Sequence, residues 1–125
     1  MGQSRDPLTQ PLVVVVDDDP AVRSSLVFSL EAEGISARAY ETGAELLLAI
    51  PNAACFIIDY KLPGMSGLDL LAELRRRQIG APMILITTHP TAAVRARAAA
   101  SGTVLIEKPL LGDALFQEVR SALGT

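Results

Sequence analysis

The sequence is poor in residues that build disulfides, zinc clusters or aromatic cores. It contains one cysteine, one histidine, two tyrosines, three phenylalanines and no tryptophan among 125 residues. A single cysteine, Cys55, can form neither an internal disulfide nor a zinc cluster, which is consistent with a reducing compartment. Because Cys55 stands beside Phe56 and Ile57, we expect it to be a small buried hydrophobe. The core must be built mainly from Val, Leu, Ile and Ala, which suits a sheet covered by helices.

The sequence also lacks an excess of positive charge. It has 11 Lys and Arg residues against 14 Asp and Glu residues, a formal net charge of −3. Because nucleic acids require a basic face, we expect no direct nucleic acid binding by this chain. The one basic run, residues 75–77, falls at the predicted end of a helix, where cations complement the helix dipole. No Gly-x-x-x-x-Gly-Lys loop or dinucleotide glycine fingerprint occurs, which argues against a nucleotide cofactor.

Long apolar runs are missing as well. The longest have the length of a strand, so none can span a bilayer. Residues 1–11 are polar, contain two prolines and lack the apolar stretch of a secretion signal. We therefore predict a flexible N-terminal tail over residues 1–11, one domain over residues 12–123, no membrane contact and a cytoplasmic location.

The sequence does contain a regular alternation of short apolar runs and helical patterns. The apolar runs predict strands over residues 12–16, 35–40, 54–58, 82–86 and 104–106. The helical patterns predict a helix from Pro20 to Gly34, helices over 42–50 and 91–100, and helices carrying Leu68 to Leu74 and Leu115 to Leu123. Strands alternating with helices predict an α/β layer fold with a parallel sheet.

Polar residues follow four of the five predicted strands. They are Asp17 and Asp18 after the first strand, Asp59 after the third, Thr87 after the fourth, and Glu107 and Lys108 after the fifth. In an open parallel sheet, ligands bind beyond the carboxyl ends of the strands, where the strand order reverses. We adopt the doubly wound order 2-1-3-4-5, in which strands one and three are neighbours roughly 4.8 Å apart. The three aspartates then share one pocket.

This pocket predicts phosphoryl chemistry. Three carboxylates so close together need a compensating cation, and the hard, oxygen-seeking Mg²⁺ is the natural partner. The metal would bridge an incoming phosphoryl oxygen and neutralise its charge. Thr87 would supply a hydroxyl donor and Lys108 a positive charge to the remaining phosphoryl oxygens. Asp59 is the predicted nucleophile.

Each residue also has a purely structural interpretation. Asp18 or Asp19 could cap a helix, and Asp59 could be a turn residue. Thr87 could be a strand-end hydroxyl and Lys108 a solvated charge. We favour the functional interpretation because four separate strand ends would rarely bring such a set of residues together by chance. The only histidine, His89, lies beside Pro90 in a predicted loop. We interpret it as a surface residue near the site and not as a phosphorelay histidine.

Four motifs carry a resemblance to a known family. They are Val-Val-Asp-Asp-Asp-Pro (15–20), Ile-Ile-Asp-Tyr-Lys-Leu-Pro-Gly-Met-Ser-Gly (57–67), Ile-Thr-Thr (86–88) and Ile-Glu-Lys-Pro (106–109). With them the chain resembles bacterial two-component response-regulator receiver domains of the CheY-like superfamily over residues 12–123. The first and last motifs are most similar to the FixJ-type subgroup, whose receivers usually precede a helix-turn-helix output domain. The resemblance implies a flavodoxin-like (βα)5 three-layer sandwich.

The resemblance also implies a function. A sensor histidine kinase would phosphorylate Asp59 in a Mg²⁺-dependent reaction, with the metal held by Asp17, Asp18, Asp59 and the backbone carbonyl of Lys61. Thr87 and Lys108 match the hydroxyl and lysine that respond to the phosphoryl group, and Pro109 follows a bond that is commonly cis in this family. The chain would catalyse only its own phosphorylation and dephosphorylation, and so would not be an enzyme.

Three kinds of partner follow from this resemblance. They are the kinase, an output domain or downstream protein that links the receiver to transcription, and a second copy of the chain in a phosphorylation-dependent homodimer. The signal would pass through the face formed by the fourth helix, fifth strand and fifth helix.

The sequence departs from the family pattern at two positions. Leu105 stands where receivers usually have Tyr or Phe, so coupling between Thr87 and an aromatic ring cannot operate in its usual form. Thr88 stands where Ala or Gly is typical, and we expect slower access to the phosphoryl site. A pseudo-receiver, acting as an interaction module with weak or no switching, is therefore the alternative. A third interpretation is a haloacid-dehalogenase-like phosphatase. Asp17–Asp19 fit the opening of its motif, but Ala21 stands where that motif has Thr or Val.

Overall fold

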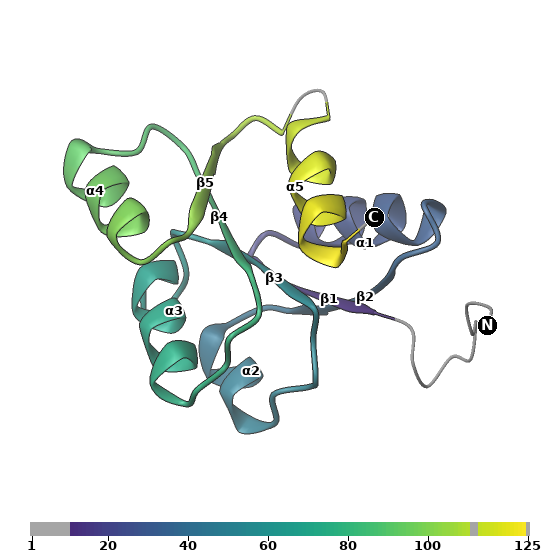
Figure 1. The fold of residues 1–125 in the computed structure, drawn as a ribbon, viewed down its shortest axis with the longest axis horizontal. Helices are drawn as coiled ribbons and strands as arrows, with labels where there is room; N and C mark the ends of the chain where they lie inside the picture. The colour runs from purple at the N-terminus through teal and green to yellow at the C-terminus, as the bar shows by residue number, and fades with distance from the viewer. Residues whose placement is uncertain (1–10, 111–112, 125) are drawn as a thin grey trace.

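The computed structural model describes residues 11–110 and 113–124 of the chain (Figure 1). Along it lie β1 (Leu12–Val16), α1 (Pro20–Ala32), β2 (Ser36–Tyr40), α2 (Gly43–Leu48), β3 (Cys55–Asp59), α3 (Gly67–Arg76), β4 (Met83–Thr87), α4 (Ala92–Ala100), β5 (Val104–Glu107) and α5 (Ala114–Leu123). The predicted N-terminal tail lies, apart from Pro11, outside the described residues. None of the described helices is long and apolar enough to cross a bilayer.

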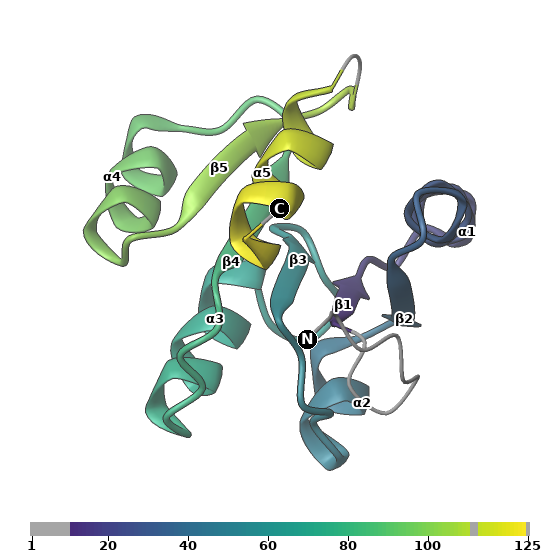
Figure 2. The ribbon, with the colours of Figure 1, turned by 45° about the vertical axis from the view of Figure 1, so that its right-hand side comes forward.

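The strands form one parallel sheet in the order β2-β1-β3-β4-β5. This confirms the predicted order, and it places β2 and β5 at the two edges (Figure 2). Helices α1 and α5 cover one face, whereas α2, α3 and α4 cover the other (Figure 1). The predicted three-layer sandwich is therefore confirmed.

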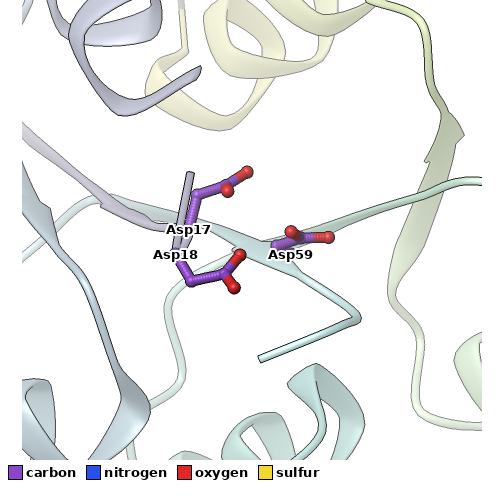
Figure 3. A group of neighbouring side chains, drawn as sticks. All are labelled: Asp17, Asp18 and Asp59. Atoms are coloured by element: carbon purple, nitrogen blue, oxygen red, sulfur yellow. The ribbon is translucent and has the colours of Figure 1, made fainter. Parts of the chain in front are cut away.

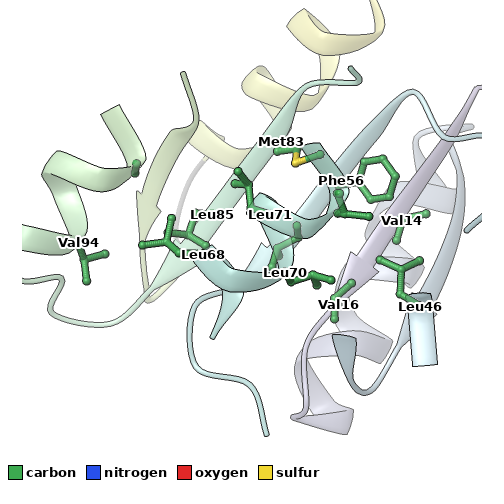
Figure 4. Close-up of a cluster of buried hydrophobic side chains, with 13 residues drawn as sticks. Val14, Val16, Leu46, Phe56, Leu68, Leu70, Leu71, Met83, Leu85 and Val94 are labelled. Carbon is green, nitrogen blue, oxygen red and sulfur yellow. The ribbon is translucent and has the colours of Figure 1, made fainter. Parts of the chain in front are cut away.

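Strand residues alternate between two apolar cores, because successive side chains of a strand point to opposite faces. Val14 and Val16 pack on the side of α2, α3 and α4, and Val13 and Val15 on the side of α1 and α5. Leucines of α3 supply much of the first core, which also contains Phe56 (Figure 4). A strand buried on both faces must be apolar throughout, which explains the continuous apolar runs in the sequence.

Cys55 lies in the second core, as expected. Its side chain is buried among the residues that α1 and α5 cover. This burial, with a smaller contribution from the charge of Glu118, raises the pKa of the thiol to about 11. The thiol is therefore protonated at neutral pH and acts as a packing residue.

Local signals set most element ends. The Asp19 carboxylate accepts a hydrogen bond from the Ala21 N–H, so Asp19 is the N-cap of α1, with Pro20 at the first helical position. Helix α2 ends at Leu48, two residues before the predicted end. The residue before a proline is restricted to extended backbone, and before Pro51 the chain is already extended at Ala49.

The arginine run at the end of α3 is used within the fold. Arg75 donates hydrogen bonds to the carbonyl oxygens of Ile79 and Ala81 at 2.9 and 3.0 Å. Arg76 and Arg77 both bind Glu73, and these hydrogen bonds lower the pKa of that carboxyl group to about 2. The structure agrees with the interpretation of the run as helix-terminal cations.

Candidate functional site

A cavity of about 520 Å³ lies at the carboxyl ends of β1, β3, β4 and β5. It collects polar residues from segments that are distant in the sequence. Its lining comprises Asp17–Asp19, Asp59–Lys61, Thr87–Thr91, Val94 and Lys108. The structure therefore brings together all the predicted site residues except Leu105 and Pro109.

Three aspartates form the acidic part of this cavity. One carboxylate oxygen from each of Asp17, Asp18 and Asp59 lies within 4.8 Å of the other two. Their side chains extend to the same side from the ends of β1 and β3 (Figure 3). Asp17 is fully buried and Asp59 is only 5% exposed, whereas Asp18 is exposed. Ionised carboxylates at this spacing repel one another unless a cation lies between or beside them.

Lys108 places a positive charge beside the acidic cluster. Its Nζ lies 3.2 Å from Asp59 Oδ2 and 3.5 Å from Asp17 Oδ2. The backbone N–H of Lys108 donates to the carbonyl oxygen of Thr87 at 2.7 Å, which ties the end of β5 to β4. Burial by itself lowers the pKa of Lys108, but the charges of Asp59 and Asp17 and the hydrogen bonds to them raise it overall.

The electrostatic balance at Asp59 favours a bound cation. Burial, and then the charge of Asp17, raise the pKa of Asp59 above its ordinary value. Lys108 and the N–H of Lys61, which lies 3.4 Å from Asp59 Oδ1, act in the opposite direction without cancelling the rise. The ionised carboxylate is thus incompletely compensated by the protein. Carboxylate oxygens are the donors that a hard ion such as Mg²⁺ takes, so the residues present fit a magnesium site.

Gly67, at the start of α3, lies very close to the backbone at the end of β3. Its N–H donates to the carbonyl oxygen of Tyr60 at 2.7 Å. A Cβ atom added at this position would lie 2.3 Å from the carbonyl oxygen of Asp59, closer than any real contact. In the sequence, Gly67 stands out only as the last residue of the motif at 57–67. Its role depends on the close approach of the loop to the strand end, which no local pattern reveals.

Residues from the end of β4 to the start of α4 also line the cavity. Thr87 is buried, whereas Thr88 and His89 are exposed. His89 adopts a left-handed backbone conformation (φ 48°) and lines the cavity, as expected for a surface residue near the site. Val94 of α4 also lines it, so this helix reaches the site directly.

Two predicted switch residues, Leu105 and Pro109, lie outside the lining of the cavity. Leu105 is half-buried and packs against the core formed with α2, α3 and α4. Pro109 follows a cis peptide bond, as the family resemblance implied, and lines a separate cavity of about 450 Å³ beside α1 and α5.

Comparison with known proteins agrees with this geometry. The family model described as "Response regulator receiver domain" matches residues 13–120. The transcriptional regulatory protein FixJ of Azorhizobium caulinodans is 37% identical over 115 residues, which cover 90% of this chain and 54% of that protein. A CheY-like response regulator receiver domain protein from Methanospirillum hungatei has a TM-score of 0.85 at 27% identity, covering 93% of this chain and 95% of that one.

A third relative has been solved with ligands relevant to this site. The response regulator TrrA of Thermotoga maritima was crystallised in complex with Mg²⁺-BeF, with a TM-score of 0.79 and 28% identity over 90% of this chain and 99% of that one. TrrA has also been solved in complex with the histidine kinase ThkA, at 29% identity and a TM-score of 0.79, with coverage of 91% of this chain and 99% of the matched one.

Sandwich topology, an acidic cavity at the strand ends and the family match define a receiver domain of the FixJ type. The chain belongs to the response regulator receiver domain family. It spans about half the length of the curated relatives it matches.

Proposed function

We propose that this receiver accepts a phosphoryl group on Asp59 from a sensor histidine kinase in a Mg²⁺-dependent reaction. The convergence of Asp17, Asp18 and Asp59 within 4.8 Å, with Lys108 Nζ 3.2 Å from Asp59, is the observation that carries the proposal. Asp59 lines the cavity from the end of β3, and we assign it the role of nucleophile.

Asp17, Asp18, Asp59 and the backbone carbonyl of Lys61 would hold Mg²⁺. When bound, the ion supplies positive charge to the acidic cluster and to the transferred phosphoryl group. Asp17 and Asp59 are buried and come from adjacent strands, so their oxygens are held at a nearly fixed separation. This preorganisation matters because Mg²⁺ accepts only a narrow range of geometries.

The transfer itself requires few groups. An oxygen of Asp59 forms a bond to phosphorus while the bond from phosphorus to the donor nitrogen of a phosphohistidine breaks, and that electron pair returns to the imidazole. Lys108 offers its charge to one phosphoryl oxygen, and the hydroxyl of Thr87 donates to another. The protein catalyses only this transfer and the later hydrolysis of its own acyl phosphate.

The partners proposed for this chain follow from its relatives. TrrA is a response regulator solved with a histidine kinase, and FixJ is a transcriptional regulatory protein. We infer that this receiver, acting in the cytoplasm, takes phosphate from a sensor histidine kinase and passes the signal through α4, β5 and α5 to a transcriptional output domain, to a downstream protein or to a second copy of itself. The chain itself would not contact nucleic acid, because its net charge is −3.

A second candidate function is an interaction module with weak or no switching. It is favoured by Leu105, which occupies the position where receivers usually have an aromatic switch residue. Leu105 packs into the core and carries no hydroxyl. Thr88 and Pro109 complete the proposed switch region, with Thr88 limiting access to the phosphoryl group. The two candidates share the fold and differ in whether phosphorylation reaches the face of α4, β5 and α5.

Intact-mass measurement after incubation with acetyl phosphate and MgCl₂ tests the chemistry. We expect the mass of one phosphoryl group to be gained, and the gain to be lost in Asp59→Asn or with EDTA. Asp113→Asn is the matched control, since Asp113 is exposed and its side chain makes no helix-capping hydrogen bond. Absence of any gain in the folded wild type would refute the proposed phosphorylation.

Backbone NMR spectra with and without beryllofluoride then separate the two candidates. A working receiver shows chemical-shift changes both around Asp59 and along α4, β5 and α5. An interaction module binds the analogue near Asp59 and leaves the resonances of α4, β5 and α5 unmoved.

A further inference from the structure

We propose that Arg23 is a positioning residue of the magnesium site, acting through the peptide bond that joins Asp17 to Asp18. The proposal rests on the metal site of the proposed function and adds a residue outside the acidic cluster. Arg23 lies in α1 and does not line the cavity formed by the strand ends.

The contact is a hydrogen bond between a charged side chain and the backbone. Arg23 Nη1 donates to the carbonyl oxygen of Asp17 at 2.7 Å, in a partly buried position. Hydrogen bonds from a charged donor are shorter and roughly twice as strong as those between neutral groups. The bond therefore restrains the plane of the Asp17–Asp18 peptide.

That peptide determines how the two predicted ligands are oriented toward each other. Asp17 and Asp18 leave the chain at neighbouring residues, and yet their carboxylates extend toward the same space as Asp59 (Figure 3). Rotation of the peptide between them would move one carboxylate relative to the other. Because Mg²⁺ requires near-octahedral geometry at short distances, small rotations weaken its binding.

The Asp17 side of this peptide is held by three further contacts. Its N–H donates to the carbonyl oxygen of Tyr40 at 3.1 Å, its Oδ1 accepts from the N–H of Asp19 at 2.9 Å, and its Oδ2 lies 3.5 Å from Lys108 Nζ. These contacts fix the amide and the carboxylate of Asp17. The carbonyl group, which leads to the exposed Asp18, is held by Arg23.

Arg23 is itself anchored in a well-defined helix start. Its N–H donates to the carbonyl oxygen of Asp19 at 3.0 Å, and the Asp19 side chain caps α1. The guanidinium thus connects the end of β1 to the first turns of α1. Groups that orient metal ligands from outside the coordination sphere commonly change metal affinity 10–100-fold when removed.

Isothermal titration of the intact chain with MgCl₂ alone tests the role of Arg23. We expect the Mg²⁺ Kd of Arg23→Ala to rise about tenfold, and Arg23→Lys, which keeps a charged donor, to restore much of the loss. Arg75→Ala is the matched control. Arg75 also donates to backbone carbonyl oxygens, at 2.9 and 3.0 Å, but these belong to the loop before β4, away from the acidic cavity.

A second titration with CaCl₂ distinguishes positioning from general loosening of the fold. Ca²⁺ tolerates flexible coordination, so Arg23→Ala should weaken Mg²⁺ binding more than Ca²⁺ binding. Arg75→Ala should lower Tm and leave the Mg²⁺ Kd within about twofold of the wild type, since metal affinity follows local ligand geometry. If Arg23→Ala does not fold, Arg23→Gln carries the test, because its amide keeps a donor without the charge, and its Kd should lie above that of Arg23→Lys.

The outcomes separate this inference from the function on which it rests. A wild type that binds no Mg²⁺ overturns the proposed metal site itself. A wild type that binds Mg²⁺ with an unchanged Kd in the Arg23 variants overturns only the role of Arg23. An equal loss in Arg75→Ala, or an unchanged ratio of Mg²⁺ to Ca²⁺ affinity in Arg23→Ala, also overturns it.

Discussion

β3 ends at Asp59 and β5 is followed directly by Lys108, and both residues line the acidic cavity, yet the surrounding protein holds the two strands very differently. Every residue of β3 is buried, and the strand is paired on both sides. In β5, an edge strand, Val104 and Glu107 are exposed, and Leu105 and Ile106 are only partly buried. Asp59 therefore stands on a fixed support, and Lys108 follows a strand with fewer constraints.

The helices beside these strands show the same contrast. α3 buries five residues and begins with a capping box between Ser66 and Asp69. α4 buries only Val94 and Ala98. Segments with few buried apolar contacts open or shift at low free-energy cost. Asp17 and Asp59 therefore stand at the ends of largely buried strands, whereas α4 and β5 are held by fewer buried side chains than α3 and β3.

Leucine-to-alanine substitutions in two paired strands test this contrast most directly. Leu85 of β4 is fully buried and pairs in register with the half-buried Leu105 of β5. We expect Leu85→Ala to lower the free energy of unfolding by about 4 kcal/mol and Leu105→Ala by about 1 kcal/mol, because less apolar surface and a smaller cavity are involved. Urea unfolding followed by circular dichroism measures both. Equal costs would mean that β5 is as firmly packed as β4.

Gly67→Ala tests the support of Asp59. The added Cβ would lie 2.3 Å from the carbonyl oxygen of Asp59, so the loop or the strand end has to shift. We expect a loss of about 3 kcal/mol in stability, together with slower phosphorylation by acetyl phosphate. Gly80→Ala is the control, because no atom lies within 4 Å of its added Cβ. That variant should stay within about 0.5 kcal/mol of the wild type.

Asp59→Asn should stabilise the protein when metal is absent. Burial and the charge of Asp17 raise the pKa of Asp59 above its ordinary value of 3.8. A carboxyl group with a raised pKa favours the folded state at low pH, and this contribution is lost as the pH rises through the folded-state pKa. At pH 7 in EDTA we expect the Tm of Asp59→Asn to exceed that of the wild type by about 4 °C, the shift that about 1 kcal/mol produces in a domain of this size.

The pH dependence and the metal dependence of that difference check its cause. The gain in Tm should shrink as the pH falls through the raised pKa of the folded wild-type carboxyl group, which lies above 3.8, because the group then becomes protonated. Addition of MgCl₂ should stabilise the wild type more than Asp59→Asn. A difference in Tm that is the same at pH 4 and pH 7 would show that charge repulsion is not its source.

The sequence was sufficient to predict the features that depend on residue type at strand ends. Buried parallel strands require continuous apolar runs, so polar residues such as Asp17, Asp59 and Thr87 mark where the strands stop. Parallel strands bring these ends to one edge of the sheet, and the cavity followed once the known order of a doubly wound fold was adopted.

Features that depend on backbone contacts could not be predicted in this way. Arg23 donates to a carbonyl oxygen, which every residue possesses, so no pattern in the sequence singles out its partner. Gly67 is required by the approach of a loop to the end of β3, which is visible only in three dimensions. The partial burial of Leu105 likewise depends on where the short α4 packs, since an apolar residue on an edge strand has no fixed burial.

Thr88→Ala tests the smallest of these contrasts, between the buried Asp59, the proposed nucleophile, and an exposed residue that lines the same cavity. Thr88 follows the buried Thr87, is exposed and lines the cavity, so its side chain narrows the approach to Asp59. We expect Thr88→Ala to raise the rate of phosphorylation by acetyl phosphate roughly threefold, which corresponds to about 0.7 kcal/mol in the barrier. Thr88→Val is the matched control, because it keeps the size of the side chain and removes the hydroxyl. If Val accelerates phosphorylation as much as Ala does, the hydroxyl group and not its bulk limits access, and the wall formed by β4 acts through hydrogen bonding.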